Sequence, residues 1–573
     1  MHLISRVIIW GIIISSASFA AEDPIYNYQE IVHPVVATQG MVSSQEAVAS
    51  RIGLSILQDG GNAIDAAIAT AYALTVTLPR AGNITGGGFM LIYLAEEQKS
   101  VFIDFREKAP KAATRDMFLD SDGNVDAAKA RFSVLSAGVP GTVAGLEFAR
   151  KTYGTKPYRE LVKPAYLLAK NGIVVSADLQ DSLEQASTQL LKDISASKIF
   201  YKSYGKPPEV GSMLKQKELA KTFKTMIQEG PESFYTGKIS EQILAYMKDS
   251  GGLITKEDLQ DYRAVKRATI KTDYQGYTVF TAPPPSSGGL LLAQMLYQLE
   301  QYPIKKWGHN SAKTIHIMTE LMKLSYADRA KWLGDTDFVP VPMNALISAD
   351  YLDERRMLIS TDKRTPSADI DPGLAHTEMP EHNDTTHFSV VDRHGNAVSV
   401  TYTLNFSYGN RKMIPGTGLF LNNEMDDFVS KAGVPNAYGL VGSAFNQIEP
   451  EKRMLSSMTP TILTKDGKVF MVTGSPGGSR IITTTLQMIL NVVDHDMTIA
   501  EATYAPRIHH QWLPDVLFIE RGLSPDTTAL LTQKGHTLRQ TRGMGSTQSI
   551  VIKKGRLYGS SVPRKPGALS VGY

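Results

Sequence analysis

Alternating apolar and polar residues mark two neighbouring segments, 385–391 and 397–403, as β-strands. The stretch between them, 392–396 (DRHGN), is rich in turn-forming residues, so the pattern predicts a tight hairpin. A three-residue loop places Phe388 opposite Val400 and keeps the apolar side chains of both strands on one face. Because a two-residue loop would mix the two faces, we expect the three-residue loop.

The other face of this hairpin carries hydroxyl groups at its open end. In the expected register Thr385 and Thr403 are cross-strand neighbours, with Cβ atoms about 5 Å apart. Asn405 follows on the same face, one pleat further along. Two facing hydroxyls and an amide at the end of a strand pair are typical of a functional site. Threonine is also an ordinary β-branched strand residue, so the pair alone does not separate a site from structural filler.

Two helices are expected near the start of the chain. Residues 43–46 (SSQE) have the spacing of an N-terminal capping box, which predicts an amphipathic helix that ends near Asp59. Asn62 can cap a second helix, from Ala63 to about Val76, whose many alanines suit close packing.

Glycine and proline mark the loops that follow. The glycine-rich stretch 82–88 leads into a strand at 89–93, with 101–105 as its partner. These glycines lack the Gly-Lys-Ser/Thr ending of a phosphate loop and precede a strand, which argues against a phosphate site. The stretch 281–289, with three successive prolines, is a stiff loop for which the residues indicate no chemical role. Residues 361–384 are polar and rich in Pro and Gly, so we expect them to be exposed.

A second glycine turn lies late in the chain, between an expected strand at 469–473 and a helix that begins at Arg480. Free backbone amides at such a turn point at whatever lies above the helix N-terminus. Gly477 and Gly478 are therefore candidates for an oxyanion hole. A phosphate site is the alternative, but no Lys-Ser/Thr follows.

Composition narrows the possible functions. The chain has 573 residues, of which 42% are hydrophobic and 20% charged, and no linker or repeat divides it, so we expect one continuous globular fold. Lys and Arg number 60 against 57 Asp and Glu, a balance that does not indicate nucleic-acid or anionic-membrane binding. The absence of cysteine excludes disulfides, thiol catalysis and cysteine-ligated metals.

The N-terminus has the pattern of an export signal. Arg6 precedes an apolar run, 7–14, and Ser18 and Ala20 provide small residues at the cleavage positions. A membrane anchor is the alternative, but the apolar run is too short to span a bilayer comfortably. We expect residues 1–20 to be a signal peptide and the mature protein to be periplasmic.

An acidic patch, Glu424-Met425-Asp426-Asp427, raises the question of a metal. Paired acids can bind cations, but no further ligands occur at a recognisable spacing and the histidines are scattered. We therefore expect neither a metal nor a cofactor.

The run 384–391 (DTTHFSVV) resembles the start of the small subunit in gamma-glutamyltransferases (gamma-glutamyltranspeptidases), which are N-terminal-nucleophile hydrolases. The resemblance covers essentially the whole mature chain. It implies an α/β fold, the four-layer αββα sandwich, with strands from both halves of the chain in its sheets. It also implies self-cleavage between Asp384 and Thr385, which gives a large subunit (21–384) and a small subunit (385–573) that form an intertwined heterodimer.

Chemistry explains why such a cut is needed. A threonine hydroxyl is a poor nucleophile without a base, and a freed α-amine can be that base. Its reference pKa of about 7.7–8.0 leaves the amine partly neutral at working pH. The resemblance thus implies attack by Thr385 on the γ-glutamyl amide of glutathione or a related compound, with transfer of the glutamyl group to water or to an amino acid or peptide.

The resemblance also assigns roles to residues remote from Thr385. An Arg directly after a strand is usually a surface ion pair, but Arg106 matches a strand-end motif of the family, where the guanidinium grips the α-carboxylate of the substrate. The remaining implied roles are binding of the α-ammonium group by Asn405, Glu424 and Asp427, binding of the carboxylate by Ser456 and Ser457, orientation of the nucleophile by Thr403, stabilisation of the oxyanion by Gly477 and Gly478, and a lid carrying Tyr438.

Two other functions fit parts of this pattern. A cephalosporin acylase of the same superfamily would share the nucleophile but lack the ammonium and carboxylate clamps. A non-catalytic periplasmic amino-acid binding protein would bind glutamate and need no cleavage. The chain also departs from the family at Val562, where Asp is common, so the role of that acid is open.

Overall fold

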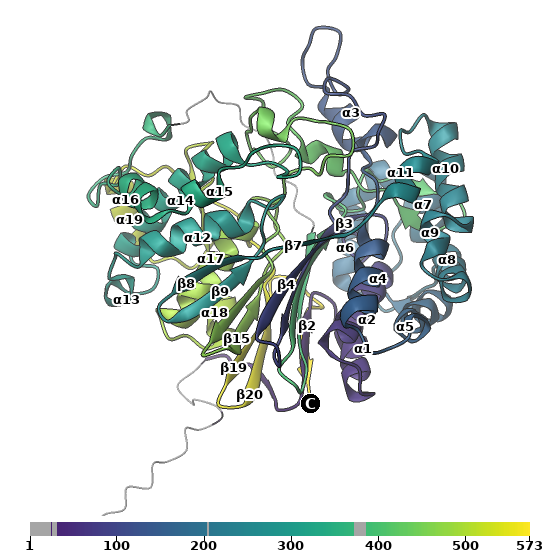
Figure 1. Ribbon diagram of the computed structural model, residues 1–573, viewed down its shortest axis with the longest axis horizontal. Coiled ribbons are helices and arrows are strands. Elements are labelled where there is room, and N and C mark those ends of the chain that lie inside the picture. Colours follow the sequence, from purple (N-terminus) through teal and green to yellow (C-terminus); the bar gives the residue numbers. More distant parts are fainter. Residues whose placement is uncertain (1–24, 26–30, 203–204, 372–384) are drawn as a thin grey trace, which may run out of the picture.

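The computed structural model describes residues 25, 31–202, 205–371 and 385–573. Two seven-stranded β-sheets lie face to face between two layers of helices (Figure 1). The expected α/β class, a four-layer αββα sandwich, is therefore confirmed. The predicted signal peptide, 1–20, lies outside the described residues. None of the helices within the described ranges is both long enough and apolar enough to span a bilayer.

Both sheets combine strands from before and after Thr385. The first sheet contains, in spatial order, β1 (Val35–Ala37), β20 (Arg556–Ser561), β19 (Gln548–Lys553), β15 (Lys468–Thr473), β14 (Thr461–Lys465), β9 (Tyr277–Thr281) and β8 (Ile270–Tyr274). The second contains β21 (Leu569–Gly572), β2 (Met41–Ser44), β10 (Thr385–Val391), β11 (Ala397–Thr403), β3 (Gly87–Leu94), β4 (Lys99–Asp104) and β7 (Val265–Arg267). Short strands form three small sheets, β12 (Met413–Ile414) with β13 (Leu419–Phe420), β16 (Ile508–His509) with β17 (Leu517–Ile519) and β18 (Leu538–Gln540), and β5 (Ile173–Val174) with β6 (Met213–Leu214).

Helices cover the outer face of each sheet (Figure 1). The second sheet packs against α1 (Ala47–Gln58), α2 (Ala63–Thr77) and α4 (Thr142–Tyr153), with α5 (Tyr158–Asn171) and α8 (Lys217–Glu229) beyond them. The first sheet packs against α12 (Gly288–Leu299) and α18 (Ile499–Tyr504), with α17 (Arg480–Val493) and α14 (Ala312–Trp332) beside them. The other described α-helices are α3 (Ala127–Phe132), α6 (Ala177–Leu190), α7 (Ile194–Phe200), α9 (Glu232–Tyr235), α10 (Lys238–Ser250), α11 (Lys256–Asp261), α13 (Ile304–Trp307), α15 (Met343–Leu346), α16 (Ala349–Arg356) and α19 (Pro525–Gln533).

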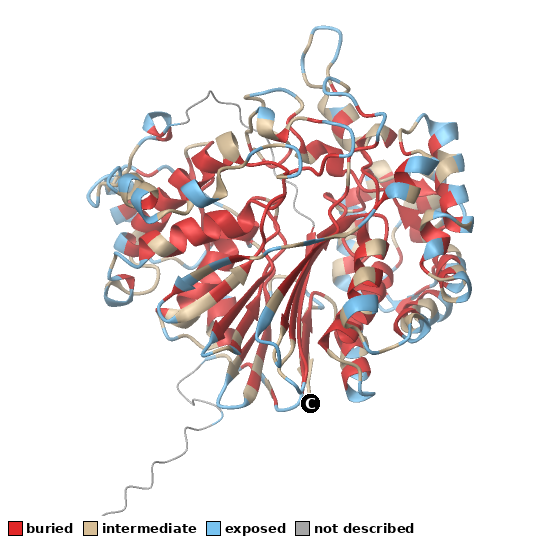
Figure 2. Ribbon diagram, in the orientation of Figure 1, coloured by how far each residue is buried: buried red, intermediate tan, exposed pale blue. Residues whose placement is uncertain are grey.

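The central strands are buried on both faces, as Figure 2 shows. In β3, Phe89 and Leu91 belong to the apolar layer between the two sheets. The alternate residues Met90 and Ile92 belong to the layer between the sheet and the helices. Because side chains alternate across a strand, burial of both faces requires the nearly continuous apolar sequence seen here.

The predicted hairpin is confirmed in register, with Thr385 opposite Thr403. Asp392 fixes the turn, since its Oδ1 accepts the Asn396 amide at 3.0 Å. Its other carboxylate oxygen accepts the amide of Ala63 at 3.0 Å, the first residue of α2. One side chain therefore closes the turn and ties it to the helix layer.

Of the two predicted helix caps, the first is wrong in detail. The spacing at 43–46 suggested a capping box, but Ser44 continues β2 and pairs with β10. Glu46 is the N-cap of α1 instead, and its carboxylate accepts a backbone amide of that helix at 2.9 Å. The second cap is confirmed, because Asn62 forms a reciprocal capping box with Asp65.

The expectation that 361–384 is exposed is wrong at Ser367. This residue is 1% exposed, its amide donates to Asp515 at 3.1 Å, and its carbonyl accepts the indole N–H of Trp512 at 3.0 Å. Residues 372–384, which include Asp384, lie outside the described part of the chain.

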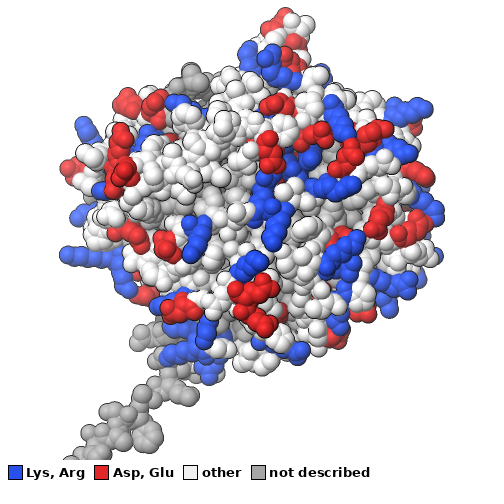
Figure 3. All heavy atoms as spheres, in the orientation of Figure 1, with Lys and Arg blue, Asp and Glu red and all other residues white. Residues whose placement is uncertain are grey.

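Charged side chains of both signs are interspersed over the face shown in Figure 3. Positive and negative groups lie next to one another there, in keeping with the small net charge of +3.

Candidate active site

Thr385 and Thr403 face each other at the open end of the hairpin. Thr385 begins β10, Thr403 ends β11, and the residues are 5% and 3% exposed. The Thr385 hydroxyl donates to Oγ1 of Thr403 at 3.4 Å. The backbone amide of Asn405 donates to the same oxygen at 2.7 Å. The Thr403 hydroxyl is thus fixed by the backbone while it faces Thr385.

The two threonines line a small, partly open cavity. Of the predicted site residues in the described ranges, only Gly477 is outside its lining. The lining comprises Arg106, Arg329, Thr385, Thr403, Asn405, Glu424, Asp427, Tyr438, Leu440, Leu455, Ser456, Ser457, Met458, Gly478, Ser479 and Ile481.

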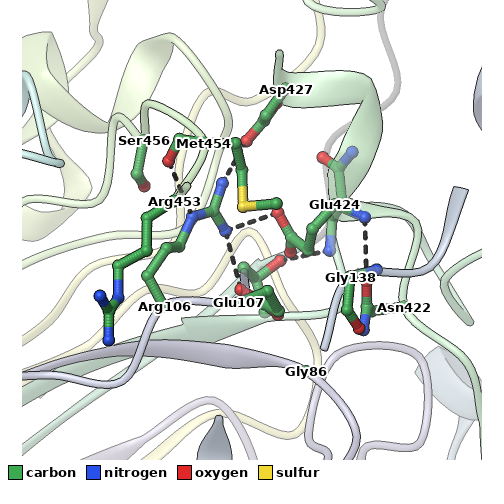
Figure 4. A network of polar contacts seen from close by, with 12 residues as sticks. Gly86, Arg106, Glu107, Gly138, Asn422, Glu424, Asp427, Arg453, Met454 and Ser456 are labelled. Atoms are coloured by element: carbon green, nitrogen blue, oxygen red, sulfur yellow. Dashed lines mark hydrogen bonds and ion pairs between the residues drawn. The ribbon is translucent and has the colours of Figure 1, made fainter. Parts of the chain in front are cut away.

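Arg106 is buried at one wall of this cavity and is surrounded by carboxylates (Figure 4). Its terminal nitrogens lie 2.5 Å from Glu424 Oε2 and 2.5 Å from Asp427 Oδ2. Glu107 Oε2 is a further 3.3 Å neighbour. The Arg106 amide donates to Asp104 Oδ1 at 2.9 Å, which fixes the chain directly after β4. The residues predicted to bind the two charges of an amino acid therefore bind one another.

The electrostatic state of this cluster follows from its burial. Burial opposes the charge of Arg106, but the surrounding carboxylates outweigh burial and raise its pKa. Burial raises the pKa of Glu424 and of Asp427, although the positive charge of Arg106 opposes this increase. Burial likewise raises the pKa of Glu107, to about 8. Three carboxylates around one guanidinium leave a surplus of acceptors, which suits the binding of an ammonium group.

Two buried charged residues of this region have no role in the sequence analysis. Glu107 is fully buried, and its Oε1 has no hydrogen-bond partner among the described residues. Arg329, which is 5% exposed, is a second guanidinium in the cavity lining. Glu107 directly follows Arg106 and reads in sequence as a surface charge pair, whereas nothing local marks Arg329, which lies on a helix far from the motifs.

Tyr438 covers the cavity beside Asn405. Its hydroxyl donates to Asn405 Oδ1 at 2.6 Å and also lies 2.9 Å from the backbone carbonyl of that residue. The ring packs edge-on against Phe406, with centroids 5.9 Å apart. The carbonyl of Tyr438 accepts a hydrogen bond from Gln511 Nε2 at 3.0 Å. Tyr438 is 6% exposed and is therefore part of the cavity wall, not of the outer surface.

Ser456 is held by the proline-rich loop, 281–289, for which the sequence indicated no role. The Ser456 amide donates to the carbonyl of Pro285 at 2.8 Å. The amide and the hydroxyl of Ser287 both donate to the Ser456 carbonyl, each at 2.8 Å. These residues are far apart in sequence, so no local pattern could reveal the contact.

The glycine turn has the predicted place, between β15 and α17. Gly477 and Gly478 have φ values of +135° and +55°, in the left-handed region that favours glycine. Their carbonyls accept the first amides of α17, from Arg480 and Ile481. Among the described residues neither glycine amide donates a hydrogen bond, and Gly478 lines the cavity. Gly477 stays a prediction, since it is not part of the lining.

One group of side chains has the composition of a metal site. His316, Glu320 and His536 are buried, and their possible ligand atoms lie within 4.8 Å of one another. Lys323 Nζ is 2.5 Å from Glu320 Oε1, however, so an internal cation already neutralises the carboxylate. The described residues contain no other such group.

The chain resembles known proteins over most of its length. The family model for gamma-glutamyltranspeptidase matches residues 49–572. The glutathione hydrolase proenzyme of Escherichia coli (strain K12) is 50% identical over 563 residues, which are 97% of this chain and 96% of that relative.

Solved structures of two kinds of enzyme resemble this chain. Cephalosporin acylase from Bacillus halodurans has a TM-score of 0.83 at 27% identity, over 96% of this chain and 99% of that one. Helicobacter pylori gamma-glutamyltranspeptidase has a TM-score of 0.57 at 42% identity, over 62% of this chain and 99% of that one. The chain belongs to the gamma-glutamyltranspeptidase family.

Proposed function

We propose that this protein cuts itself between Asp384 and Thr385 and then acts as a gamma-glutamyltransferase that cleaves glutathione and related γ-glutamyl compounds. The observation that carries the proposal is the placement of two buried, facing hydroxyls on a cavity whose wall holds Arg106 between carboxylates. The names of the relatives support the same activity.

Self-cleavage begins with Thr385. Its Oγ attacks the carbonyl carbon of Asp384, and the bond from that carbon to the Thr385 nitrogen breaks as the nitrogen takes up the hydroxyl proton. The resulting ester is hydrolysed by water, which leaves a carboxylate on Asp384 and a free α-amine on Thr385. Thr403, 3.4 Å away, orients the hydroxyl in this step and in later turnovers.

The substrate binds by exchange of ion pairs. Its α-carboxylate takes the place of protein carboxylates at Arg106 and receives further hydrogen bonds from Ser456 and Ser457. Its α-ammonium group then binds Glu424, Asp427 and Asn405. Each buried charge keeps an opposite charge, which avoids the cost of an unpaired buried ion.

Glutamyl transfer follows the same chemistry as the self-cleavage. The freed Thr385 amine takes the hydroxyl proton while Oγ attacks the γ-carbonyl carbon, and backbone amides of Gly477 and Gly478 stabilise the oxyanion by about 3 kcal/mol each. The leaving amine takes the proton, so glutathione releases its cysteinyl-glycine part. Water or an acceptor amine then attacks the ester and restores Thr385. Asn405 and Tyr438 hold the cavity closed during these steps.

The mature protein would comprise a large subunit (21–384) and a small subunit (385–573), joined as a heterodimer. Its strands support this assignment, because both sheets take strands from each side of Thr385. Export to the periplasm after removal of residues 1–20 rests on the sequence pattern of the N-terminus.

Intact-mass analysis of purified wild type and Thr385→Ala tests the cut. We expect two fragments that divide at 384/385 in wild type and a single chain in Thr385→Ala. Thr386→Val is the matched control: Thr386 is fully buried on the other face of β10, its hydroxyl has no hydrogen-bond partner in the described part of the chain, and valine preserves its shape. Efficient cutting of Thr385→Ala, or an uncut wild type, would overturn the proposal.

A second candidate is a cephalosporin acylase-type amidase, favoured by the structural likeness to the Bacillus halodurans enzyme. Comparison of γ-glutamyl-p-nitroanilide with glutaryl-p-nitroanilide separates the two, because the glutaryl group lacks the ammonium for which Glu424 and Asp427 are placed. We expect hydrolysis of the first substrate only. Hydrolysis of the second alone would identify the acylase, and reversible glutamate binding by an uncut chain would indicate a binding protein.

A further inference from the structure

The cavity contains a second guanidinium, Arg329, that the proposed mechanism does not use. It lies near the C-terminal end of α14, is 5% exposed and contributes to the same lining as Arg106 and Thr385. A buried positive charge at a reaction cavity requires an explanation, because an unpaired buried ion is costly.

Arg329 differs from Arg106 in its partners. Its Nε donates to Ser287 Oγ at 3.1 Å, and this is the one side-chain hydrogen bond it makes among the residues that the structure describes. No carboxylate of the described residues lies within 4.0 Å of its terminal nitrogens, whereas Arg106 has three such neighbours. Burial lowers the pKa of Arg329, an effect that Tyr326 and Asp427 only partly offset. The two terminal nitrogens are therefore free to bind an anion.

The chemistry of guanidinium selects the kind of anion. Its planar fork matches a carboxylate with two parallel hydrogen bonds. We propose that Arg329 is a second carboxylate-binding residue of the cavity and holds a carboxylate of the bound γ-glutamyl compound through its terminal nitrogens. This inference rests on the proposed function.

Two carboxylates of such a compound could occupy this position. One is the α-carboxylate of the γ-glutamyl group, which Arg329 would share with Arg106. The other is the C-terminal carboxylate of the peptide part, which glutathione has and γ-glutamyl-p-nitroanilide lacks. The two substrates therefore distinguish the two sources.

The experiment must exclude the alternative that Arg329 has a purely structural role. Ser287, the partner of its Nε, also donates to the Ser456 carbonyl at 2.8 Å. In this alternative Arg329 does not touch the substrate, and its role is limited to positioning Ser456 through Ser287. Ser287→Ala removes that connection but leaves the guanidinium in place, so it measures the structural contribution separately.

The experiment compares self-processed wild type, Arg329→Met, Ser287→Ala and Arg355→Met. Arg355 is the matched control, since it binds Asp328, the neighbour of Arg329 on α14, at 3.1 Å and does not line the cavity. We expect Arg329→Met to raise KM for glutathione about 10- to 100-fold with a smaller change in kcat, as for loss of a charged hydrogen bond. Arg355→Met should leave KM unchanged.

The arms of the test separate the outcomes. An equal rise in KM for both substrates assigns the α-carboxylate to Arg329, and a rise for glutathione alone assigns the peptide carboxylate. An unchanged KM for both substrates, or the same rise in Ser287→Ala, would overturn the inference. If Arg329→Met is not processed, Arg329→Lys carries the test, because it keeps the charge but loses the fork; a KM equal to that of wild type would again overturn the inference. Failure of the proposed function is recognised separately, by a wild type that is uncut or inactive on both substrates.

Discussion

At the scale of single residues, the proposed role of Arg106 links the stability of the fold to substrate binding. Its guanidinium neutralises Glu424 and Asp427 in a buried site, so its removal leaves buried carboxylates without a cation. We expect Arg106→Met to raise KM for γ-glutamyl-p-nitroanilide and to lower the free energy of unfolding by about 3–5 kcal/mol. Arg106→Lys should lose less stability, because a charge remains, but should still bind substrate poorly. Thermal unfolding and steady-state kinetics measure the two effects.

Arg80→Met is the matched control for this prediction. Arg80 is a buried guanidinium that pairs with Asp178 outside the cavity, so its loss should lower stability without a change in KM. A loss of turnover in Arg106→Met with KM unchanged would contradict the binding role.

The sequence identified most of the residues that line the cavity but not the contacts between them. Arg106 and Asp427 are placed by their motifs, yet nothing in the motifs indicates that they pair with each other. Glu107 and Arg329 were missed, because their burial arises only when distant segments pack together. Charged residues are exposed in most proteins, so sequence reasoning assigns them to the surface unless a motif says otherwise.

At the scale of elements, the loop that carries Tyr438 is fastened by that side chain. The Tyr438 hydroxyl bonds Asn405 at 2.6 Å, and its removal should release the loop and admit water to the glutamyl ester. We expect Tyr438→Phe to lower the ratio of transfer to hydrolysis several-fold, as for a hydrogen bond of about 1 kcal/mol. Chromatography of the products formed with a fixed concentration of glycylglycine measures this ratio.

Tyr201→Phe provides the comparison. Its hydroxyl donates to the Leu183 carbonyl at 2.7 Å, in a buried position away from the cavity. We expect its product ratio to equal that of wild type. The same ratio in Tyr438→Phe would show that this hydroxyl does not control access.

Some predictions of local structure were confirmed and others were wrong, for physical reasons. The register of the hairpin followed from alternation, since a slip of one residue would expose its apolar face. The cap proposed at 43–46 failed because Ser44 gains strand pairing with β10, which a local pattern does not register. The proline-rich loop had no visible role because its partner, Ser456, is distant in sequence.

At the scale of the whole molecule, two buried histidines, one from each side of Thr385, make the stability of the fold depend on pH. His536, beyond α19, lies 2.8 Å from His316 of α14, and burial together with His316 lowers its pKa from 6.5 to about 3. Between these values the unfolded chain binds one more proton than the folded chain, so stability falls as the pH falls. His536→Gln should therefore reduce the pH dependence of the unfolding free energy by up to about 1.4 kcal/mol per pH unit between pH 6.5 and 4.

Denaturant unfolding on the uncut Thr385→Ala background measures this difference for one continuous chain. Buried acids such as Asp426, whose pKa burial raises to about 7, act in the opposite direction but cancel between the variants. His394→Gln, at the exposed hairpin turn, is the control for replacement of a histidine by glutamine. If the unfolding free energy of His536→Gln depends on pH as steeply as that of its parent, His536 is not a source of this pH dependence.

The proposed cut changes how the interleaved strands of the two sheets can assemble. Before cleavage the pairing of β10 with β2 is an intramolecular event, and folding proceeds at a rate independent of protein concentration. If the chain is cut as proposed, the same pairing joins two polypeptides, and recovery from the unfolded state becomes a bimolecular reaction that dilution slows. The proposed cut removes the covalent connection that brings these strands together, so a cleaved enzyme would no longer assemble its two sheets as a single molecule.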